Sequence, residues 1–137
     1  EYRSLLERLK VERKQRVGEL SGGTKMKLAM ALALAHKPRL LILDEPTAGV
    51  DPVARAEILD TLRDEVRNHG RTVFFSTHHL LEVEQIGDVV GVLNQGALFY
   101  EGDLNGLADA VHEVRPELPE QASLEAAFVA IARDVTP

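Results

Sequence analysis

The chain contains no cysteine and no tryptophan among its 137 residues. The absence of cysteine excludes a disulfide framework, a zinc site built on thiolates and a cysteine nucleophile. Long apolar runs are also absent, because no pure apolar stretch approaches the ~20 residues of a membrane-spanning helix. The remaining composition, 45% hydrophobic and 28% charged, is typical of an ordinary soluble domain.

Positive charge is concentrated at the front of the chain. Residues 1–39 contain 10 Lys and Arg against 4 Asp and Glu, whereas residues 40–137 contain 6 against 18. The basic front could bind a polyanion or could be a solvated helix face, and the acidic remainder argues against a protein that coats nucleic acid. Nucleic acid is therefore not expected as a partner.

The spacing of apolar residues predicts alternating helices and strands. The runs 40–43 and 73–75 are typical of parallel strands that are covered on both faces. Because a helix separates them, the sequence predicts a right-handed parallel α/β unit. A hairpin is expected over 89–100, with its turn at 94–96. Helices are expected over 2–17, 24–35, 51–69, 80–86, 103–110 and 124–132, with a connector over 113–121.

Ser21, Gly22 and Gly23 stand directly before a strong helix-forming segment. Ser21 is expected to cap that helix, because its hydroxyl can accept one of the unpaired backbone N–H groups. Glycines let the backbone approach a ligand closely, and a helix N-terminus attracts anions, so this segment is a candidate phosphate-binding site. Taken alone, the same residues are also typical of a simple loop.

Asp44 and Glu45 follow the predicted strand 40–43. In open α/β sheets, ligands bind beyond the carboxyl ends of the strands, where these two carboxylates are expected. Asp44 is a candidate ligand for Mg²⁺, which prefers oxygen ligands and keeps much of its water. Glu45 is a candidate general base for an attacking water. The alternative is a pair of capping carboxylates.

Two further polar residues stand at the ends of predicted elements. Asp51 precedes Pro52 at a helix start, so capping alone accounts for it. His78 follows the second strand, where an imidazole can donate a hydrogen bond to a phosphate. A zinc site at His78 and His79 is disfavoured, because adjacent ligands without a cysteine or a third histidine make poor geometry. The remaining histidines are expected at the surface: His36, His69 and His112.

In this order, the four features resemble the nucleotide-binding subunit of an ATP-binding cassette (ABC) transporter. Residues 20–24 resemble the family signature, which usually ends in Gln rather than Thr. Residues 40–45 resemble the Walker B strand, and residues 48–51 resemble the D-loop, although its first three residues differ from the commonest form. His78 resembles the switch histidine of the H-loop. The resemblance covers residues 15–100 well and the later helices more loosely.

The resemblance implies both a fold and a set of roles. The fold is expected to be a partial P-loop NTPase-type α/β parallel sheet with flanking helices, followed by a C-terminal β-hairpin and helices. Asp44 would hold Mg²⁺, and Glu45 and His78 would be catalytic toward ATP in the same subunit. The remaining candidate nucleotide-binding residues, which would face a partner subunit, are Ser21, Gly22, Gly23 and Asp51.

Several family motifs do not occur in this sequence. It contains no G-x-x-x-x-G-K-[ST] segment, the P-loop that cradles phosphates, and neither the adenine-stacking loop nor the Q-loop. We therefore expect the C-terminal part of a longer cassette. Residues 1–36 would end a helical subdomain, 37–100 would form half of the catalytic core, and 101–137 would be a helical extension. Alone, the chain is expected to lack ATPase activity and to self-associate through unpaired sheet edges.

By the same resemblance, the parent protein is an ATP hydrolase that couples ATP and Mg²⁺ binding to membrane transport. Its partners would be a second cassette and transmembrane transporter subunits, at the cytoplasmic face of the cell membrane. Residues 124–128 resemble the C-terminal helix of exporter-type cassettes, so export is expected. Two alternatives stay open: an ABC-type ATPase of DNA repair or translation, and a non-catalytic module that docks a partner through a basic helix over 8–16.

Overall fold

The chain folds into two compact units, each with its own two-stranded sheet. The computed structural model describes residues 2–114, 116, 126, 128 and 129, and the two units are Glu1–His78 and His79–Pro137. The predicted α/β class, with parallel strands and flanking helices, is confirmed. The three-part division drawn from the motifs stays a prediction.

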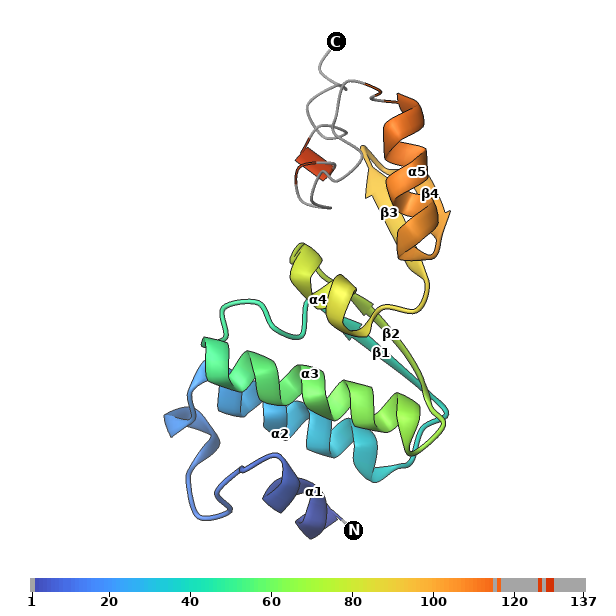
Figure 1. The fold of residues 1–137 in the computed structure, drawn as a ribbon. Coiled ribbons are helices and arrows are strands. Elements are labelled where there is room, and N and C mark those ends of the chain that lie inside the picture. Colours follow the sequence, from blue (N-terminus) through green and yellow to red (C-terminus); the bar gives the residue numbers. More distant parts are fainter. Residues whose placement is uncertain (1, 115, 117–125, 127, 130–137) are drawn as a thin grey trace. The chain divides into compact units, whose positions relative to one another are not determined.

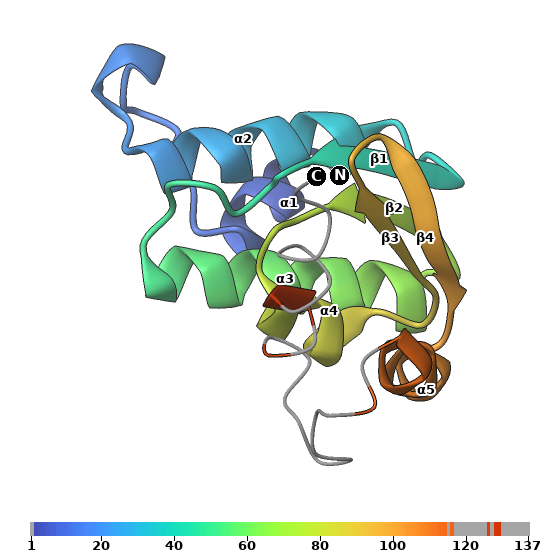
Figure 2. The same ribbon diagram turned by 90° about the horizontal axis from the view of Figure 1, so that it is seen from above.

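In the first unit, two long helices lie between a short sheet and a third helix (Figures 1 and 2). Helices α2 and α3 run side by side along one face of the sheet, and α1 lies on the opposite side of this helical pair. The elements are α1 Tyr2–Arg8, a 3₁₀ helix at Val17–Glu19, α2 Gly22–Ala35, β1 Leu40–Asp44, α3 Pro52–Arg67 and β2 Thr72–Ser76.

Strands β1 and β2 are parallel and pair without a register shift. Leu40 lies opposite Thr72, and the following pairs stay aligned as far as Asp44 and Ser76, the last residues of the two strands. Polar side chains from both strands therefore reach the same edge of the sheet. This register determines the geometry of the candidate site described below.

The two faces of the β1–β2 sheet have different surroundings. Leu41 is 4% exposed on the face that packs against the helices, whereas Ile42 and Phe74 are 68% and 67% exposed. The prediction that both faces of these strands are covered is therefore wrong within the described residues. Side chains alternate along a strand, and helices α2 and α3 cover only one of the resulting faces.

The first helix is much shorter than predicted. Instead of continuing to residue 17, α1 ends at Arg8, and Lys10 adopts a left-handed conformation with φ of 54°. The N–H of Val11 donates to the carbonyl of Leu6 at 2.8 Å, as in a Schellman motif. This turn buries Val11, an apolar gain that a continuous helix would forgo. The basic helix over 8–16, on which the docking alternative depended, does not form.

The other helices of this unit follow their capping signals. Helix α2 begins at Gly22, two residues earlier than predicted, because Ser21 is its N-cap. Helix α3 begins after its predicted cap and ends at Arg67, two residues before the predicted end. Gly70 then has φ of 62°, a left-handed conformation that glycine tolerates, in the turn to β2.

A nearly buried lysine ties α2 to α3. The side chain of Lys27 in α2 is 10% exposed and pairs with Glu57 of α3. The same carboxylate accepts a hydrogen bond from Lys10 Nζ at 2.6 Å. Hydrogen bonds from the two lysines hold the pKa of Glu57 below its ordinary value. Because Lys27 would be costly to bury without a carboxylate, Glu57 fixes the pairing of these helices.

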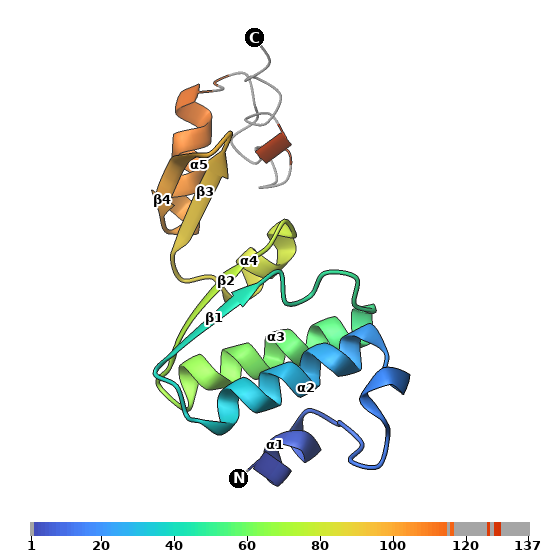
Figure 3. The ribbon, with the colours of Figure 1, turned by 180° about the vertical axis from the view of Figure 1, so that it is seen from behind.

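The second unit contains a hairpin packed on a helix, which Figure 3 shows from behind. Gln95 and Gly96 have φ of 49° and 78°, as expected for a two-residue turn that matches the twist of antiparallel strands. The core of this unit contains Val92, Leu107 and Val111. The predicted hairpin is thus confirmed. The elements are α4 Leu80–Ile86, β3 Val90–Asn94, β4 Ala97–Gly102 and α5 Leu104–Val114.

Helix α5 continues to Val114, beyond the predicted end at residue 110. Its apolar positions Leu107 and Val111 lie one turn apart, so packing on the hairpin continues past that point. The predicted connector over 113–121 therefore begins inside a helix. The rest of that connector and most of the helix predicted over 124–132 lie outside the described residues.

None of the helices in the described part of the chain has the length and apolar character of a membrane-spanning segment.

Replacing Glu57 by Gln should lower the free energy of unfolding by about 1–3 kcal/mol at neutral pH, because Lys27 loses its charged partner. The folded-state pKa of Glu57 lies below its ordinary value. Its stabilisation is therefore fully present above about pH 4.3, the ordinary glutamate pKa, and is lost as pH falls through the lower folded-state value. Urea unfolding at several pH values measures this difference.

The matched control is Glu12→Gln, which removes an exposed glutamate elsewhere on the same unit and should change stability little. A Glu57→Gln difference that stays equally large in strong acid would contradict the assigned charge pairing.

The open sheet of the first unit generates a prediction about association. Ile42 and Phe74 expose large apolar side chains, and within the described residues each strand of this sheet has a partner on one side only. Such faces and edges favour pairing with another chain. We expect the 137-residue chain by itself to sediment as dimers or larger species. A compact monomer at every concentration tested would contradict this expectation.

Candidate functional site

The carboxyl ends of β1 and β2 bring polar side chains together at one edge of the sheet. Asp44 and Ser76 form the last pair of the ladder. The Ser76 hydroxyl donates a hydrogen bond to Asp44 Oδ1 at 2.5 Å and accepts one from the backbone N–H of Glu45 at 2.9 Å. Together with His78, which contacts Glu45, these residues are called the strand-end group below.

Glu45 leaves the strand in a conformation that is rare for its residue type. Its φ of 44° lies in the left-handed region, which costs a non-glycine residue about 1–2 kcal/mol. Its Oε1 lies 3.0 Å from Nδ1 of His78, and the two side chains are 44% and 60% exposed respectively. Burial therefore does not hold this pair in place. Both side chains are accessible to a substrate.

The donor atoms of the strand-end group suit a hard cation. Asp44 and Glu45 supply carboxylate oxygens and Ser76 a hydroxyl oxygen, and none of the three residues is buried. Mg²⁺ prefers oxygen ligands and retains several waters, so an accessible edge with one or two carboxylates fits it. A carboxylate beside an imidazole, as in Glu45, can also accept a proton from water.

A second group of predicted site residues lies at the start of α2. Ser21 is the N-cap, as predicted, and its Oγ accepts a hydrogen bond from the N–H of Thr24 at 3.1 Å. Gly22 and Gly23 occupy the first turn, where the helix supplies no carbonyl to their N–H groups. These N–H groups and the positive end of the helix dipole suit an anion.

The start of α3 packs against the start of α2. Asp51 caps α3 by accepting hydrogen bonds from the N–H groups of Val53 and Ala54, both at 3.0 Å. Gly23 lies so close that a Cβ there would stand 2.9 Å from Ala54 Cβ and 3.2 Å from Val50 Cγ1. The residues Ser21, Gly22, Gly23 and Asp51 therefore form one local assembly, called the helix-start group. The loop between β1 and α3 connects it to the strand-end group.

Sequence reasoning did not assign a role to Ser76. The sequence places it at the end of a predicted strand, but its bonds to Asp44 and Glu45 depend on which residues of the two strands face each other. The available signal was its position two residues before His78, at the end of a strand adjacent to the one that ends in two acids. Register could not be read from the apolar pattern of these strands.

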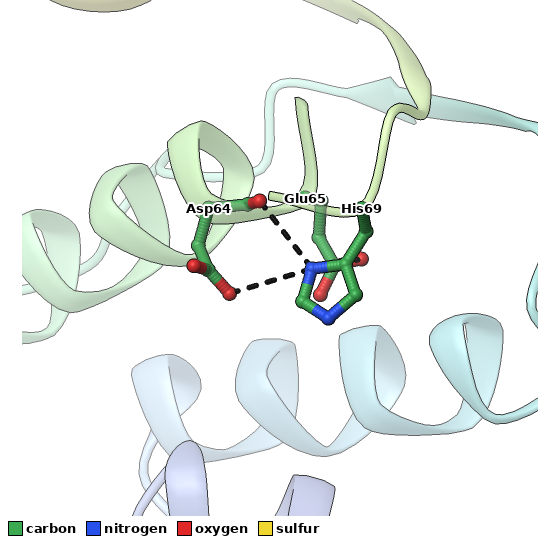
Figure 4. A group of neighbouring side chains, drawn as sticks. All are labelled: Asp64, Glu65 and His69. Carbon is green, nitrogen blue, oxygen red and sulfur yellow. Dashed lines mark hydrogen bonds and ion pairs between the residues drawn. The ribbon is translucent and has the colours of Figure 1, made fainter. Parts of the chain in front are cut away.

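Asp64, Glu65 and His69 form another cluster of potential metal ligands, at the end of α3 (Figure 4). His69 Nδ1 lies 3.6 Å from Asp64 Oδ2. Glu65 is almost fully buried, and its two oxygens pair with Arg8 of α1 and with Arg71 Nη1, the latter at 2.6 Å. Because the two arginines neutralise Glu65, the cluster is an ion-pair network that joins α1 and α3 to the segment before β2.

A basic cavity of about 460 Å³ opens beside this network. Its basic lining comes from α1 and from the segments that precede β1 and β2, at the opposite edge of the sheet from the strand-end group, and Glu65 of α3 lines it as well. Helices α2 and α3 both end there, and the carbonyls of a helix C-terminus carry partial negative charge. Basic side chains at this edge balance the partial negative charge of the helix ends and the negative charge of Glu65. They are Arg8, Lys37, Arg39 and Arg71.

A protein-family model covers most of the first unit. Residues 7–84 match the family described as "AAA domain, putative AbiEii toxin, Type IV TA system". The matched span contains both the helix-start group and the strand-end group. Its limits do not reach the hairpin β3–β4 or helix α5.

Curated relatives with similar sequences are ATP-binding proteins of transporters. The chain is 45% identical over 93 residues to the uncharacterized ABC transporter ATP-binding protein YxlF of Bacillus subtilis (strain 168). The matched region covers 68% of this chain and 31% of that protein. It is 42% identical over 96 residues to the bacitracin transport ATP-binding protein BcrA of Enterococcus faecalis, covering 70% of this chain and 31% of that protein.

A third relative carries an export function in its name. The chain is 44% identical over 108 residues to the Nod factor export ATP-binding protein I of Rhizobium sp. (strain N33). The matched region covers 77% of this chain and 35% of that protein. The chain thus spans about a third of the length of these curated relatives.

Solved structures with a similar fold are ATP-binding cassettes. The dimeric post-hydrolysis state of the cassette MJ0796 bound to ADP and Pi matches with a TM-score of 0.66 at 27% identity, covering 74% of this chain and 44% of that one. An inward-facing conformation of a putative metal-chelate type ABC transporter matches with a TM-score of 0.73 at 26% identity, covering 86% and 48% respectively.

Replacing Gly23 by Ala should lower the free energy of unfolding by about 1–3 kcal/mol, because the new Cβ would overlap Ala54 and crowd Val50. Urea unfolding measures the loss. The matched control is Gly22→Ala, where the nearest atom to the new Cβ, the carbonyl oxygen of Gly49, is 4.0 Å away. That variant should keep wild-type stability. Equal stability of the two variants would contradict the close packing of α2 on α3.

Proposed function

The chain belongs to the AAA-domain family, and its relatives and structural neighbours are ATP-binding cassettes, as its motifs predicted. We propose that it carries the signature, Walker B, D-loop and H-loop of a transport ATPase. The observation that carries the proposal is the strand-end group. There Asp44, Glu45 and His78 meet at the carboxyl edge of a parallel sheet, accessible to a ligand and linked by hydrogen bonds.

In the proposed reaction, the strand-end group acts on ATP bound in its own subunit. Asp44 would hold Mg²⁺. Glu45 orients the attacking water and accepts its proton. His78 holds the Glu45 carboxylate through Nδ1. In the imidazolium form both ring nitrogens carry a hydrogen, and Nε2 would then donate to the γ-phosphate while Nδ1 donates to Glu45. When bound there, Mg²⁺ would neutralise charge that develops on the phosphates, which together with positioning is what phosphoryl transfer requires.

The helix-start group is proposed to act on ATP held by a second cassette. Ser21, Gly22 and Gly23 would contact the γ-phosphate through first-turn donors of α2, and Asp51 would bridge the two subunits. Gly23 packs closely on Val50, the residue before Asp51. This packing supports the proposal that the phosphate contact of Gly23 and the bridge made by Asp51 move together. The dimeric state of the related cassette MJ0796 supports the pairing of two cassettes.

We further propose that the ATPase works with transmembrane transporter subunits at the cytoplasmic face of the cell membrane, in the export direction. The names of the relatives support this proposal, since one serves bacitracin transport and another Nod factor export. The resemblance of residues 124–128 to exporter-type cassettes points the same way. That segment lies outside the described residues.

Glu45→Gln tests the proposed catalytic role. In the complete ATPase that contains this chain, the substitution should lower the rate of ATP hydrolysis by at least about 100-fold while ATP still binds, because the amide cannot take the proton of the attacking water. The 137-residue chain by itself should show no turnover, since its sequence has no P-loop segment. Phosphate release in the presence of Mg–ATP measures both.

The matched control is Glu84→Gln, which changes an exposed glutamate of α4 and should leave hydrolysis unchanged. Two outcomes would contradict the proposal. One is near-wild-type hydrolysis by Glu45→Gln in the complete protein. The other is Mg²⁺-dependent turnover by the 137-residue chain that Glu45→Gln abolishes.

A further inference from the structure

A single hydroxyl contacts both acidic residues of the strand-end group. Ser76 Oγ donates to Asp44 Oδ1 at 2.5 Å and accepts from the N–H of Glu45 at 2.9 Å. A serine hydroxyl has one hydrogen to donate and two lone pairs with which to accept. Here the hydrogen is committed to Asp44 and a lone pair to Glu45. The rotation of the hydroxyl is therefore fixed by two neighbours at once.

The bond to Asp44 fixes the orientation of that carboxylate. An O–H···O⁻ separation of 2.5 Å lies at the short end of the range for charge-assisted hydrogen bonds. The bond occupies Oδ1 and opposes rotation of the carboxylate about its own axis, which leaves Oδ2 to face a cation or its water. Groups that hold a ligating carboxylate in this way tune metal affinity and activity.

The bond from Glu45 acts on the backbone where the chain leaves β1. At φ of 44°, Glu45 occupies a region that is unfavourable for a non-glycine residue, and the hydrogen bond to Ser76 offsets part of that cost. This conformation accompanies the placement of Glu45 Oε1 at 3.0 Å from His78 Nδ1. Ser76 is two residues before His78, so it ties the backbone of Glu45 to the segment that supplies its partner.

Burial does not require these hydrogen bonds. Asp44 and Ser76 are exposed, so water could satisfy their polar atoms. The hydroxyl that accepts the N–H of Glu45 has one hydrogen left to donate, and it donates this hydrogen to Asp44, the candidate Mg²⁺ ligand. We propose that Ser76 is a positioning residue that orients Asp44 toward Mg²⁺ and holds Glu45 in reach of the attacking water. This role rests on the proposed ATPase function.

The first arm of the test needs no ligand. In the 137-residue chain, NMR measures amide hydrogen exchange at Glu45 in the wild type, Ser76→Ala and Ser76→Thr. Loss of the accepting hydroxyl should make exchange about fivefold faster in Ser76→Ala, and the threonine hydroxyl should restore it. The matched control is Thr72→Ala, at the exposed start of the same strand, which should leave Glu45 unchanged. Equal exchange in wild type and Ser76→Ala would overturn the proposal.

The second arm uses the complete ATPase. Ser76→Ala should lower kcat by about 10- to 100-fold and raise the Mg²⁺ concentration needed for half-maximal activity, with little change in KM for ATP. Ser76→Thr should restore both values. Should Ser76→Ala fail to fold, Ser76→Val and Ser76→Thr form an isosteric pair that differs only in the hydroxyl, and the same contrast is expected between them.

The outcomes separate this role from the proposed function on which it rests. Wild-type kcat in Ser76→Ala, combined with loss of hydrolysis in Glu45→Gln, would overturn the role of Ser76 and leave the proposed function standing. Wild-type hydrolysis in both variants would overturn the catalytic assignment of the strand-end group and the role of Ser76 together.

Discussion

The in-register parallel pairing of β1 and β2 is the constraint on which the candidate site depends. It places Asp44 opposite Ser76 at the last position of each strand, and the residues that follow, Glu45 and His78, then come within 3.0 Å of each other. A shift of one residue would move every side chain of one strand to the other face of the sheet. Asp44 and Ser76 would then point to opposite faces of the sheet and could no longer form their hydrogen bond.

Close packing at the helix starts places the second set of candidate residues. Ser21 and Asp51 each cap a helix, and the absence of a side chain at Gly23 lets the two helix starts approach. Glycine there serves packing as well as access to a phosphate. The loop from β1 to α3 joins the helix-start group to the strand-end group. We therefore expect a displacement of one group to shift the other.

The sequence predicted those features that depend on local signals. The caps at Ser21 and Asp51 and the hairpin turn at Gly96 follow from side-chain and backbone chemistry within a few residues. The fold class followed from the alternation of apolar runs and helices. Apart from Ser76, the candidate residues in the two groups were named from motif and position, although their roles remain proposals.

Features that depend on contacts between distant residues could not be predicted in this way. The early end of α1 at Arg8 is accompanied by the burial of Val11. The sequence predicted a helix as far as residue 17, because Gly18 is the next residue that breaks a helix. The ion pairs of Glu65 with Arg8 and Arg71 join segments that are far apart in the sequence. The bonds of Ser76 depend on strand register. The continuous apolar sequences of β1 and β2 predicted that both faces of their sheet are covered. Within the described residues, only the face that packs against α2 and α3 is covered.

A structure of the complete protein with Mg²⁺ and a non-hydrolysable ATP analogue would test the central claim most directly. We expect Mg²⁺ at Asp44, bound directly or through one water, with Ser76 still hydrogen-bonded to that carboxylate and the γ-phosphate beside Glu45 and His78. Nucleotide and metal bound in a place that contacts none of these residues would contradict it.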